Sequence, residues 1–162
     1  MNSFSMEINF KQKDVVMIKQ IFKSNTDWTG FILRLTIGFI LFPHGAQKVF
    51  GWFGGYGFEG TMSFFTSTMH IPWVIGILVI LIEFIGSVFL IAGFATRIWA
   101  FAVITNMAGI IFSSHIQNGF FMNWFGNQAG EGIEYFLLVI GLSIALLING
   151  SGKYSVDKLI VR

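Results

Sequence analysis

A few polar side chains stand within stretches of this chain that are otherwise apolar, and they are its candidates for chemistry. A carboxylate can accept or relay a proton, a histidine changes charge near neutral pH, and a buried cation can hold an anionic group. Ionisable groups among apolar residues are costly unless they find partners, and they often mark binding sites or proton paths. The candidate residues of a polar network or pocket are Arg34, His44, Lys48, Glu83, Asn106, His115 and Glu134.

Helical geometry brings part of this set together. At 100° per residue, Lys48 lies about 40° and His44 about 80° around a helix from Arg34, so the three share one side. The simplest ion pair joins Arg34 to Glu83, because arginine keeps its charge and a lone buried glutamate must protonate or find a cation. Two interpretations stay open: an ion pair that only locks two helices together, or the charged base of a substrate pocket or proton-transfer step.

A second polar group comes from the ends of the expected helices and consists of His44, Lys48, His115, Glu131 and Glu134. It is either ordinary interfacial polarity or an outward-facing pocket with a titratable histidine. His44 and His115 lie at a similar depth, as haem ligands would, but they stand without a sustained motif and we do not expect haem. The carboxylate-plus-Glu-x-x-His pattern of di-iron bundles is missing from the sequence, and no metal site is expected.

The composition decides what kind of element carries these residues. Hydrophobic residues make up 54% of the 162 residues and charged residues only 11%, against about 25% charged in a typical globular protein. This excludes a soluble enzyme or a disordered chain, and a net charge of +2 is too small for a nucleic-acid binder. Cysteine is absent, which excludes disulfides and thiolate metal sites. The sequence therefore predicts a membrane protein.

Four apolar stretches predict an all-α, integral membrane four-helix bundle, with helices at about 28–50, 72–92, 97–114 and 133–149. A crossing needs about 20 apolar residues and must be helical in lipid, so the third, short stretch is expected to stand upright or thin the bilayer. Lysine and arginine are missing from loops 51–71 and 115–132. The positive-inside rule then places both termini in the cytoplasm and both loops outside.

The segments outside the spans are read as follows. Residues 1–27 form a basic amphipathic cytoplasmic leader in which Val15, Ile18 and Phe22 share a helical face, so it is either an interfacial helix at the N-terminus or a mobile basic leader. Residues 28–150 form the four-helix domain, and 151–162 a cytoplasmic tail. Glycines that alternate with aromatic residues in 51–60 predict either a lid over the bundle or a compact connection.

In their order along the chain, the polar candidate residues and several glycine-containing segments resemble the DoxX family of small four-helix membrane proteins, from about Trp28 to Asp157. The resemblance implies a multi-pass protein of the bacterial or archaeal inner membrane. The family is named after a membrane subunit associated with terminal quinol oxidation, and related members take part in thiosulfate oxidation coupled to quinone. The resemblance rests on Arg34, His44-Gly45-Ala46-Gln47-Lys48, Pro72, Glu83, Gly86, Gly93-Phe94-Ala95-Thr96-Arg97, His115, Gly119-Phe120, Glu134-Tyr135 and Gly150-Ser151-Gly152-Lys153-Tyr154-Ser155-Val156-Asp157.

Three functions follow as hypotheses, and whether the chain is an enzyme stays open. The first is a subunit of a bacterial inner-membrane redox system that binds quinone or quinol in an outward-facing pocket. There His115 or His44 would bond a ring oxygen, and Glu134 or Glu83 would relay the proton. The alternatives are a non-catalytic assembly or scaffold subunit and a small-solute permease. The expected partners are the lipid bilayer and either redox subunits or a second copy of the chain.

Overall fold

The computed structural model describes residues 22–23 and 25–161, and all regular secondary structure in that part of the chain is helical. Three helices are long and apolar enough to cross a membrane: Trp28–Phe50, Trp73–Ala92 and Thr96–Asn118, of 23, 20 and 23 residues. A further apolar helix, Glu134–Asn149, has 16 residues. The chain is therefore an all-helical, multi-pass membrane protein. The leader helix expected around Val15 lies outside the described residues.

Short irregular turns interrupt the long helices. Three of these turns (η2, η3 and η4) are π-helical, and two (η1 and η5) are 3₁₀ turns. The elements are α2 (Trp28–Phe50), η1 (Trp52–Gly54), α3 (Gly57–Ser63), η2 (Phe64–Thr68), α4 (Trp73–Leu81), η3 (Ile82–Gly86), α5 (Ser87–Ala92), α6 (Thr96–Ile110), η4 (Ile111–His115), η5 (Ile116–Asn118), α7 (Glu134–Asn149) and α8 (Asp157–Val161).

The third span is longer than the expected 97–114, which removes the reason for expecting it to stand upright or thin the bilayer. The apolar run ends before Ser113, but the backbone continues to coil through η4 and η5 to Asn118. Serine and histidine lower the hydropathy without breaking a helix. Hydropathy therefore placed this end too early.

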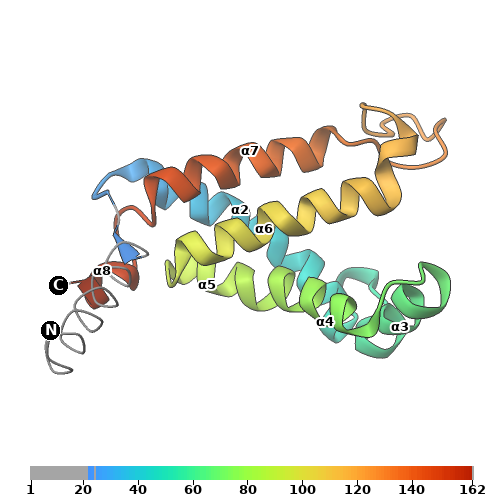
Figure 1. Ribbon diagram of the computed structural model, residues 1–162, viewed down its shortest axis with the longest axis horizontal. Coiled ribbons are helices and arrows are strands. Elements are labelled where there is room, and N and C mark those ends of the chain that lie inside the picture. The colour runs from blue at the N-terminus through green and yellow to red at the C-terminus, as the bar shows by residue number, and fades with distance from the viewer. Residues whose placement is uncertain (1–21, 24, 162) are drawn as a thin grey trace, which may run out of the picture.

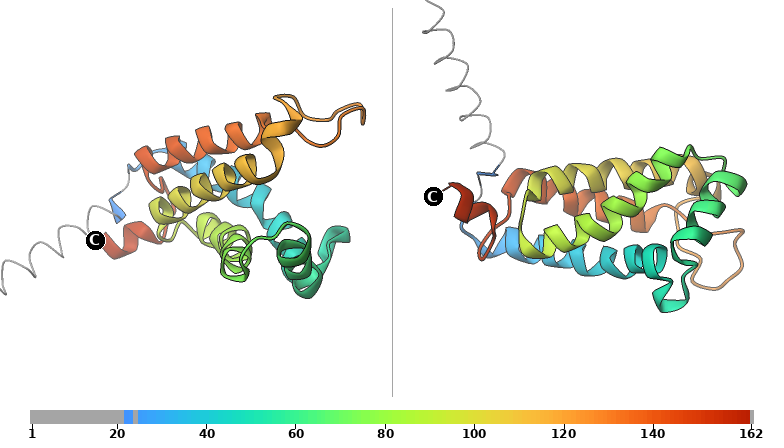
Figure 2. Two further views of the ribbon diagram at one scale, coloured as in Figure 1. Left: turned by 45° about the vertical axis from the view of Figure 1, so that its right-hand side comes forward. Right: turned by 90° about the horizontal axis from the view of Figure 1, so that it is seen from below.

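The long helices lie side by side and enclose one main core (Figures 1 and 2). Helix α2 packs against η3 and α5 and also against α7, while α6 packs against α7 and α5. The buried side chains between them include Ile37, Leu41, Leu90 and Leu146. Large apolar side chains on the outer faces are exposed, such as Phe101 at 62%. An apolar exterior of this kind suits contact with lipid tails rather than water.

Glycines on α2 let it approach the second span closely. A Cβ atom added at Gly45 would lie 2.5 Å from Cα of Phe84, and one at Gly38 would lie 2.6 Å from Cγ1 of Ile91. Neither distance leaves room for a side chain. Small residues at such crossings are the usual means of close helix packing in membranes, and here they fix how far α2 is shifted along η3 and α5.

Figure 1 separates the connections into two groups at opposite ends of the bundle. One end carries α3 and the long loop between η5 and α7. The other end carries the tight turn between α5 and α6, together with the segment that follows α7. This second end is held by Arg34, which is 1% exposed.

Arg34 donates hydrogen bonds to backbone carbonyls only. Carbonyls in the last turn of a helix have no intrahelical partner, and a cation near this end is favourable because of the helix dipole. The guanidinium donates hydrogen bonds to two carbonyls at the end of α5 and to three carbonyls in the segment after α7. The acceptors are the carbonyl oxygens of Leu90, Ile91, Ser151, Lys153 and Tyr154.

Asp157 satisfies the start of the neighbouring helix. Its carboxylate accepts hydrogen bonds from the backbone N–H groups of Ala95 (2.6 Å) and Thr96 (3.0 Å) where α6 begins. Its own N–H donates to the carbonyl of Gly93 at 2.9 Å. Gly93 has a φ of 70°, and a Cβ atom there would lie 2.6 Å from Cβ of Ser155. The residues after α7 are thus packed against the bundle up to Asp157.

Asp27 joins the start of α2 to the end of α7. Its carboxylate accepts a hydrogen bond from the side-chain amide of Asn149 at 3.0 Å, and as the N-cap it accepts another from the Gly30 N–H at 3.3 Å. These bonds, that of Asn149 foremost, lower the pKa of Asp27 below its ordinary value. The cap therefore contributes fully above that ordinary value and is lost as the pH falls through the lowered pKa.

The predicted ion pair between Arg34 and Glu83 is wrong. In the antiparallel packing of α2 on the second span, Arg34 faces the end of α5 near Leu90, whereas Glu83 lies on η3 about two helical turns away. Glu83 pairs instead with Lys48, at 2.5 Å between Nζ and Oε2. A prediction from charge alone does not consider backbone carbonyls. Those at the end of α5 and after α7 accept hydrogen bonds from all the N–H groups of the Arg34 guanidinium.

We predict that replacing Arg34 with lysine destabilises the protein although the charge is kept. An ammonium group has three donors, so at least two buried carbonyls lose their partner, at a cost of about 3 kcal/mol. The matched control is Arg97→Lys, because Arg97 Nη2 donates to a single carbonyl, that of Ile148, at 3.1 Å. Thermal unfolding in detergent, followed by size-exclusion chromatography, measures both. Equal midpoints for the two variants would contradict the role given to Arg34.

Candidate functional site

A cavity of about 960 Å³ lies between α2, the α4–η3 helix, the α6–η4 helix and the start of α7. Most of its lining is apolar, including Leu41, Phe65, Ile82 and Met107. Cavities that hold small ligands have about 300–1,000 Å³ and a mainly apolar lining with a few polar groups. The cavity therefore has the size and composition of a ligand site.

Five of the seven candidate residues line this cavity. They come from three different helices, which shows that the bundle brings together polar side chains far apart in the sequence. They are His44, Lys48, Glu83, Asn106 and His115. Arg34 lies at the opposite end of the bundle and Glu134 beside the loop between η5 and α7, and neither belongs to the cavity lining.

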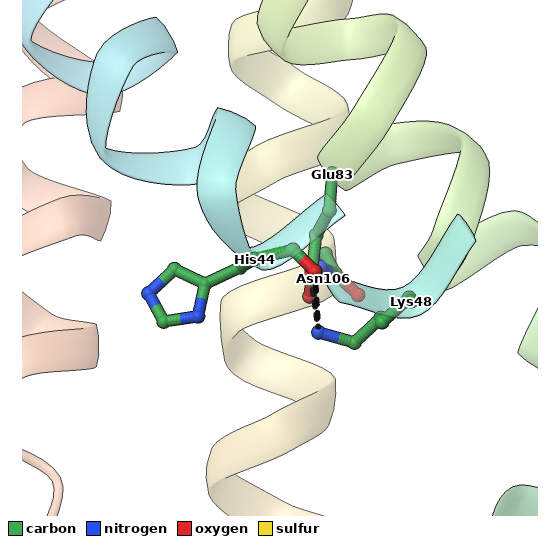
Figure 3. Close-up of polar contacts among 4 residues, drawn as sticks. All are labelled: His44, Lys48, Glu83 and Asn106. Atoms are coloured by element: carbon green, nitrogen blue, oxygen red, sulfur yellow. Dashed lines mark hydrogen bonds and ion pairs between the residues drawn. The ribbon is translucent and has the colours of Figure 1, made fainter. Parts of the chain in front are cut away.

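The centre of the polar group is a buried triad of Lys48, Glu83 and Asn106 (Figure 3). Lys48 Nζ lies 2.5 Å from Glu83 Oε2, and Asn106 Nδ2 donates to Glu83 Oε1 at 3.3 Å. The Glu83 side chain is 4% exposed and that of Lys48 is 22% exposed. Each carboxylate oxygen thus has one donor, and the pair carries no net charge into the apolar interior.

Two π-helical turns carry residues of the site. Turn η3 contains Glu83, and η4 ends at His115. A π turn inserts an extra residue into a helix, which reorients the side chains of that turn, and such turns are frequent at functional sites. Neither turn is expected from the sequence, because hydropathy does not distinguish a π turn from an α-helix.

The two histidines of the site are not directed to a common point. In Figure 3 the His44 ring points away from Glu83 and Lys48. The His115 ring packs against Phe136 with centroids 4.5 Å apart, and its Nδ1 lies 3.3 Å from the carbonyl oxygen of Ile110. Within residues 22–23 and 25–161, no three His, Asp or Glu side chains are grouped as a metal ion would require.

The acidic residues near the start of α7 organise the loop that precedes it. Glu134 Oε2 accepts from the N–H of Met122 at 3.2 Å, and Glu131 Oε2 accepts from that of Asn123 at 2.7 Å. Of these residues, Glu131 and Met122 also contribute to the cavity lining. Glu134 therefore holds the loop that closes one end of the cavity rather than facing the cavity.

The sequence analysis missed Tyr135 as a cavity residue. Its side chain lines the cavity, and its ring packs edge-on against Phe136 with centroids 5.4 Å apart. In the sequence analysis Tyr135 belongs only to the Glu134-Tyr135 pair that contributes to the DoxX resemblance. A tyrosine in the first turn of an apolar helix, one polar atom on a large apolar ring, is the signal that could have found it.

The cavity opens toward the apolar outside of the bundle. Figure 1 shows α4 diverging from α6, whereas η3 and α5 remain in contact with α6. Phe64, Ile75 and Leu78 line the cavity, and their exposed fractions are 46%, 47% and 46%. Side chains that belong both to the cavity and to the outer surface mark its opening. A molecule dissolved in the lipid phase can reach the cavity by this path.

Fold and site together define a small helical membrane protein with a ligand-sized, mainly apolar cavity that contains a neutral ion pair. Comparison with known proteins gives the family: the DoxX family model matches residues 30–116, and the chain belongs to that family. The matched region contains the cavity residues from His44 to His115 and ends before α7.

One relative is similar over most of its length. The "Putative oxidoreductase CatD" of Bacillus subtilis (strain 168) is 29% identical over 131 residues, which are 81% of this chain and 86% of that protein. No solved structure matches the chain.

We predict an asymmetric cost of breaking the Lys48–Glu83 pair. Lys48→Met leaves a carboxylate buried without a cation, and we expect a loss of about 3 kcal/mol. Glu83→Gln should cost less, because the partly exposed ammonium can turn to water. The double variant should lose less than the sum of the two. Thermal midpoints of the four proteins form the cycle, and additive losses would contradict a direct interaction.

Proposed function

We propose that this protein is a subunit of a bacterial inner-membrane redox system and that it binds a quinone or quinol in the cavity. The observation that carries the proposal is a cavity of about 960 Å³ with an apolar lining, an opening toward lipid and a few convergent polar groups. The Bacillus subtilis relative, which is named a putative oxidoreductase, supports a redox setting.

The cavity suits the two chemical parts of such a ligand. The apolar tail can lie along Ile75, Leu78 and Ile82 of the second span, which line the cavity toward its opening. The ring, with its oxygen atoms, requires hydrogen-bond partners, and His115 and Glu83 offer them from the polar side. A carboxylate and an imidazole can each exchange a proton, as reduction of a quinone to a quinol requires.

The geometry favours one carboxylate and one histidine among the residues considered for proton exchange and for contact with the quinone ring. Glu134 bonds the N–H of Met122 and is held at the loop, so Glu83 is the carboxylate that we propose for proton exchange. His115 is half-buried beside Phe136, whereas the ring of His44 is directed away from the triad (Figure 3). We therefore assign the ring contact to His115.

We propose that both termini face the cytoplasm and that the cavity opens in the outer half of the membrane. The loops without lysine or arginine share one end of the bundle, and the α5–α6 turn and the segment after α7 lie at the other (Figure 1). Arg97 belongs to the first turn of α6 and Lys153 to the segment after α7. This distribution is what the positive-inside rule requires. The cavity lies on the side of the loops without lysine or arginine, because the lining includes Met122 and Glu131.

Labelling of single cysteines tests this orientation, and the absence of natural cysteine makes the background clean. We predict that Asn127→Cys, in the exposed loop before α7, reacts in intact spheroplasts with a maleimide that does not cross membranes. Lys158→Cys should react only after the membrane is opened. The reverse pattern would overturn the proposed orientation.

Filling the cavity tests quinone binding. Gly109 lines the cavity, and a Cβ atom there would meet nothing within 4 Å, so Gly109→Phe should fold normally and occupy ligand space. Gly141 on α7 also has open space but does not line the cavity, which makes Gly141→Phe the matched control. We predict that decylubiquinone at 100 times its Kd stabilises the wild type and the control by about 2.7 kcal/mol. Gly109→Phe should lose most of this effect.

A short-chain menaquinone and an alkylbenzene with the same chain serve as further probes. The menaquinone covers organisms that use naphthoquinones, and the alkylbenzene reports binding of the chain alone. If the purified protein carries no quinone and neither quinone raises its thermal midpoint, the proposal is wrong. The assembly-subunit hypothesis would then remain.

A further inference from the structure

The hydroxyl group of Tyr135 stands out among the buried polar atoms. Within the described part of the chain, four buried side-chain polar atoms have no hydrogen-bond partner, and they belong to Thr96, Arg97, Tyr135 and Ser143. Of these residues, Tyr135 alone lines the cavity. A buried hydroxyl without a partner is costly, so its presence at the wall of a ligand-sized cavity calls for an explanation.

Several other polar side chains of the cavity already have hydrogen-bond partners within the protein. Lys48 and Asn106 both donate to Glu83. His115 Nδ1 is within 3.3 Å of the carbonyl of Ile110. The Tyr135 hydroxyl, by contrast, is buried and has no hydrogen-bond partner among the described residues of the ligand-free protein.

Packing fixes the plane of the Tyr135 ring. The Tyr135 ring lies edge-on to Phe136, with an interplanar angle of 80°, and Phe136 in turn contacts the His115 ring. The phenol belongs to the layer of partly buried side chains packed on the main core. Its orientation is thus set before any ligand binds, which limits the entropy lost on binding.

We propose that Tyr135 is a ligand-binding residue that hydrogen-bonds a ring oxygen of the quinone, an assignment that rests on the proposed function. A phenol both donates and accepts. It therefore donates to the carbonyl oxygen of the quinone and can accept from the hydroxyl of the quinol, so both redox states are bound by the same group. Because the hydroxyl is neutral and Lys48 neutralises Glu83, the site selects a neutral amphiphile.

Tyr135→Phe tests the assignment, because it removes one oxygen and keeps the ring. We expect the Kd of decylubiquinone to rise about tenfold, which corresponds to about 1.4 kcal/mol. The Kd of the alkylbenzene with the same chain should not change. Tyr56→Phe is the matched control, since Tyr56 lies near the same end of the bundle but is 82% exposed and outside the cavity lining.

Two further readouts separate ligand binding from a structural role. The thermal midpoint of the ligand-free Tyr135→Phe variant should equal or exceed that of the wild type, because an unpaired hydroxyl has been removed. In the infrared spectrum, the carbonyl band of bound decylubiquinone should move to higher frequency in the variant, as a lost hydrogen bond requires.

The outcomes are distinct. Wild-type protein that binds decylubiquinone with the same Kd and carbonyl band as Tyr135→Phe overturns the role of Tyr135 and leaves the proposed function standing. A ligand-free variant with a lower midpoint and an unchanged Kd shows a hydroxyl bonded within the folded protein, and this also overturns the assignment. Wild-type protein that binds no quinone overturns both proposals.

Discussion

The structure depends on the hydrogen-bond and ion-pair partners of two cations on one face of α2, inside a bundle that has very few other charges. Arg34 and Lys48 are fourteen residues apart, close to four helical turns or about 21 Å. Both point toward the second span, which runs antiparallel to α2. One meets the carbonyls at the end of α5 and the other meets Glu83 on η3. A slip of one turn would separate Lys48 from Glu83 and Arg34 from the end of α5, so both contacts favour the register that the glycines of α2 allow.

The two cations are satisfied by different kinds of partner, and only one of these partners lies at the cavity. Every acceptor of Arg34 is a backbone carbonyl, and these bonds join α2 to the end of α5 and to the segment after α7. Such a site has no group left for a ligand. The partner of Lys48 is a side chain at the wall of a cavity. An ion pair of side chains can be rearranged, whereas a helix end cannot.

The sequence was sufficient for the helical class, because long apolar stretches in a chain with little charge have few alternatives in lipid. It also pointed to Lys48, Glu83, Asn106 and His115, since ionisable and amide groups among apolar residues require partners. It could not decide which cation meets Glu83. That choice depends on the register of α2 against η3, which close contacts at Gly45 determine. Hydrogen bonds to backbone carbonyls, such as those of Arg34, leave no trace in the pattern of charges.

The placement of η3 links the ion pair to the opening of the cavity. After this π turn the chain continues as α5, which stays in contact with α6, whereas α4, before the turn, diverges from α6 (Figure 1). Glu83 therefore lies where the packed part of the bundle ends and the open part begins. A carboxylate without partners would be unfavourable at that position beside lipid. Lys48 and Asn106 both donate hydrogen bonds to Glu83. The polar triad thus gives the wall of the cavity a buried carboxylate whose charge is balanced by Lys48.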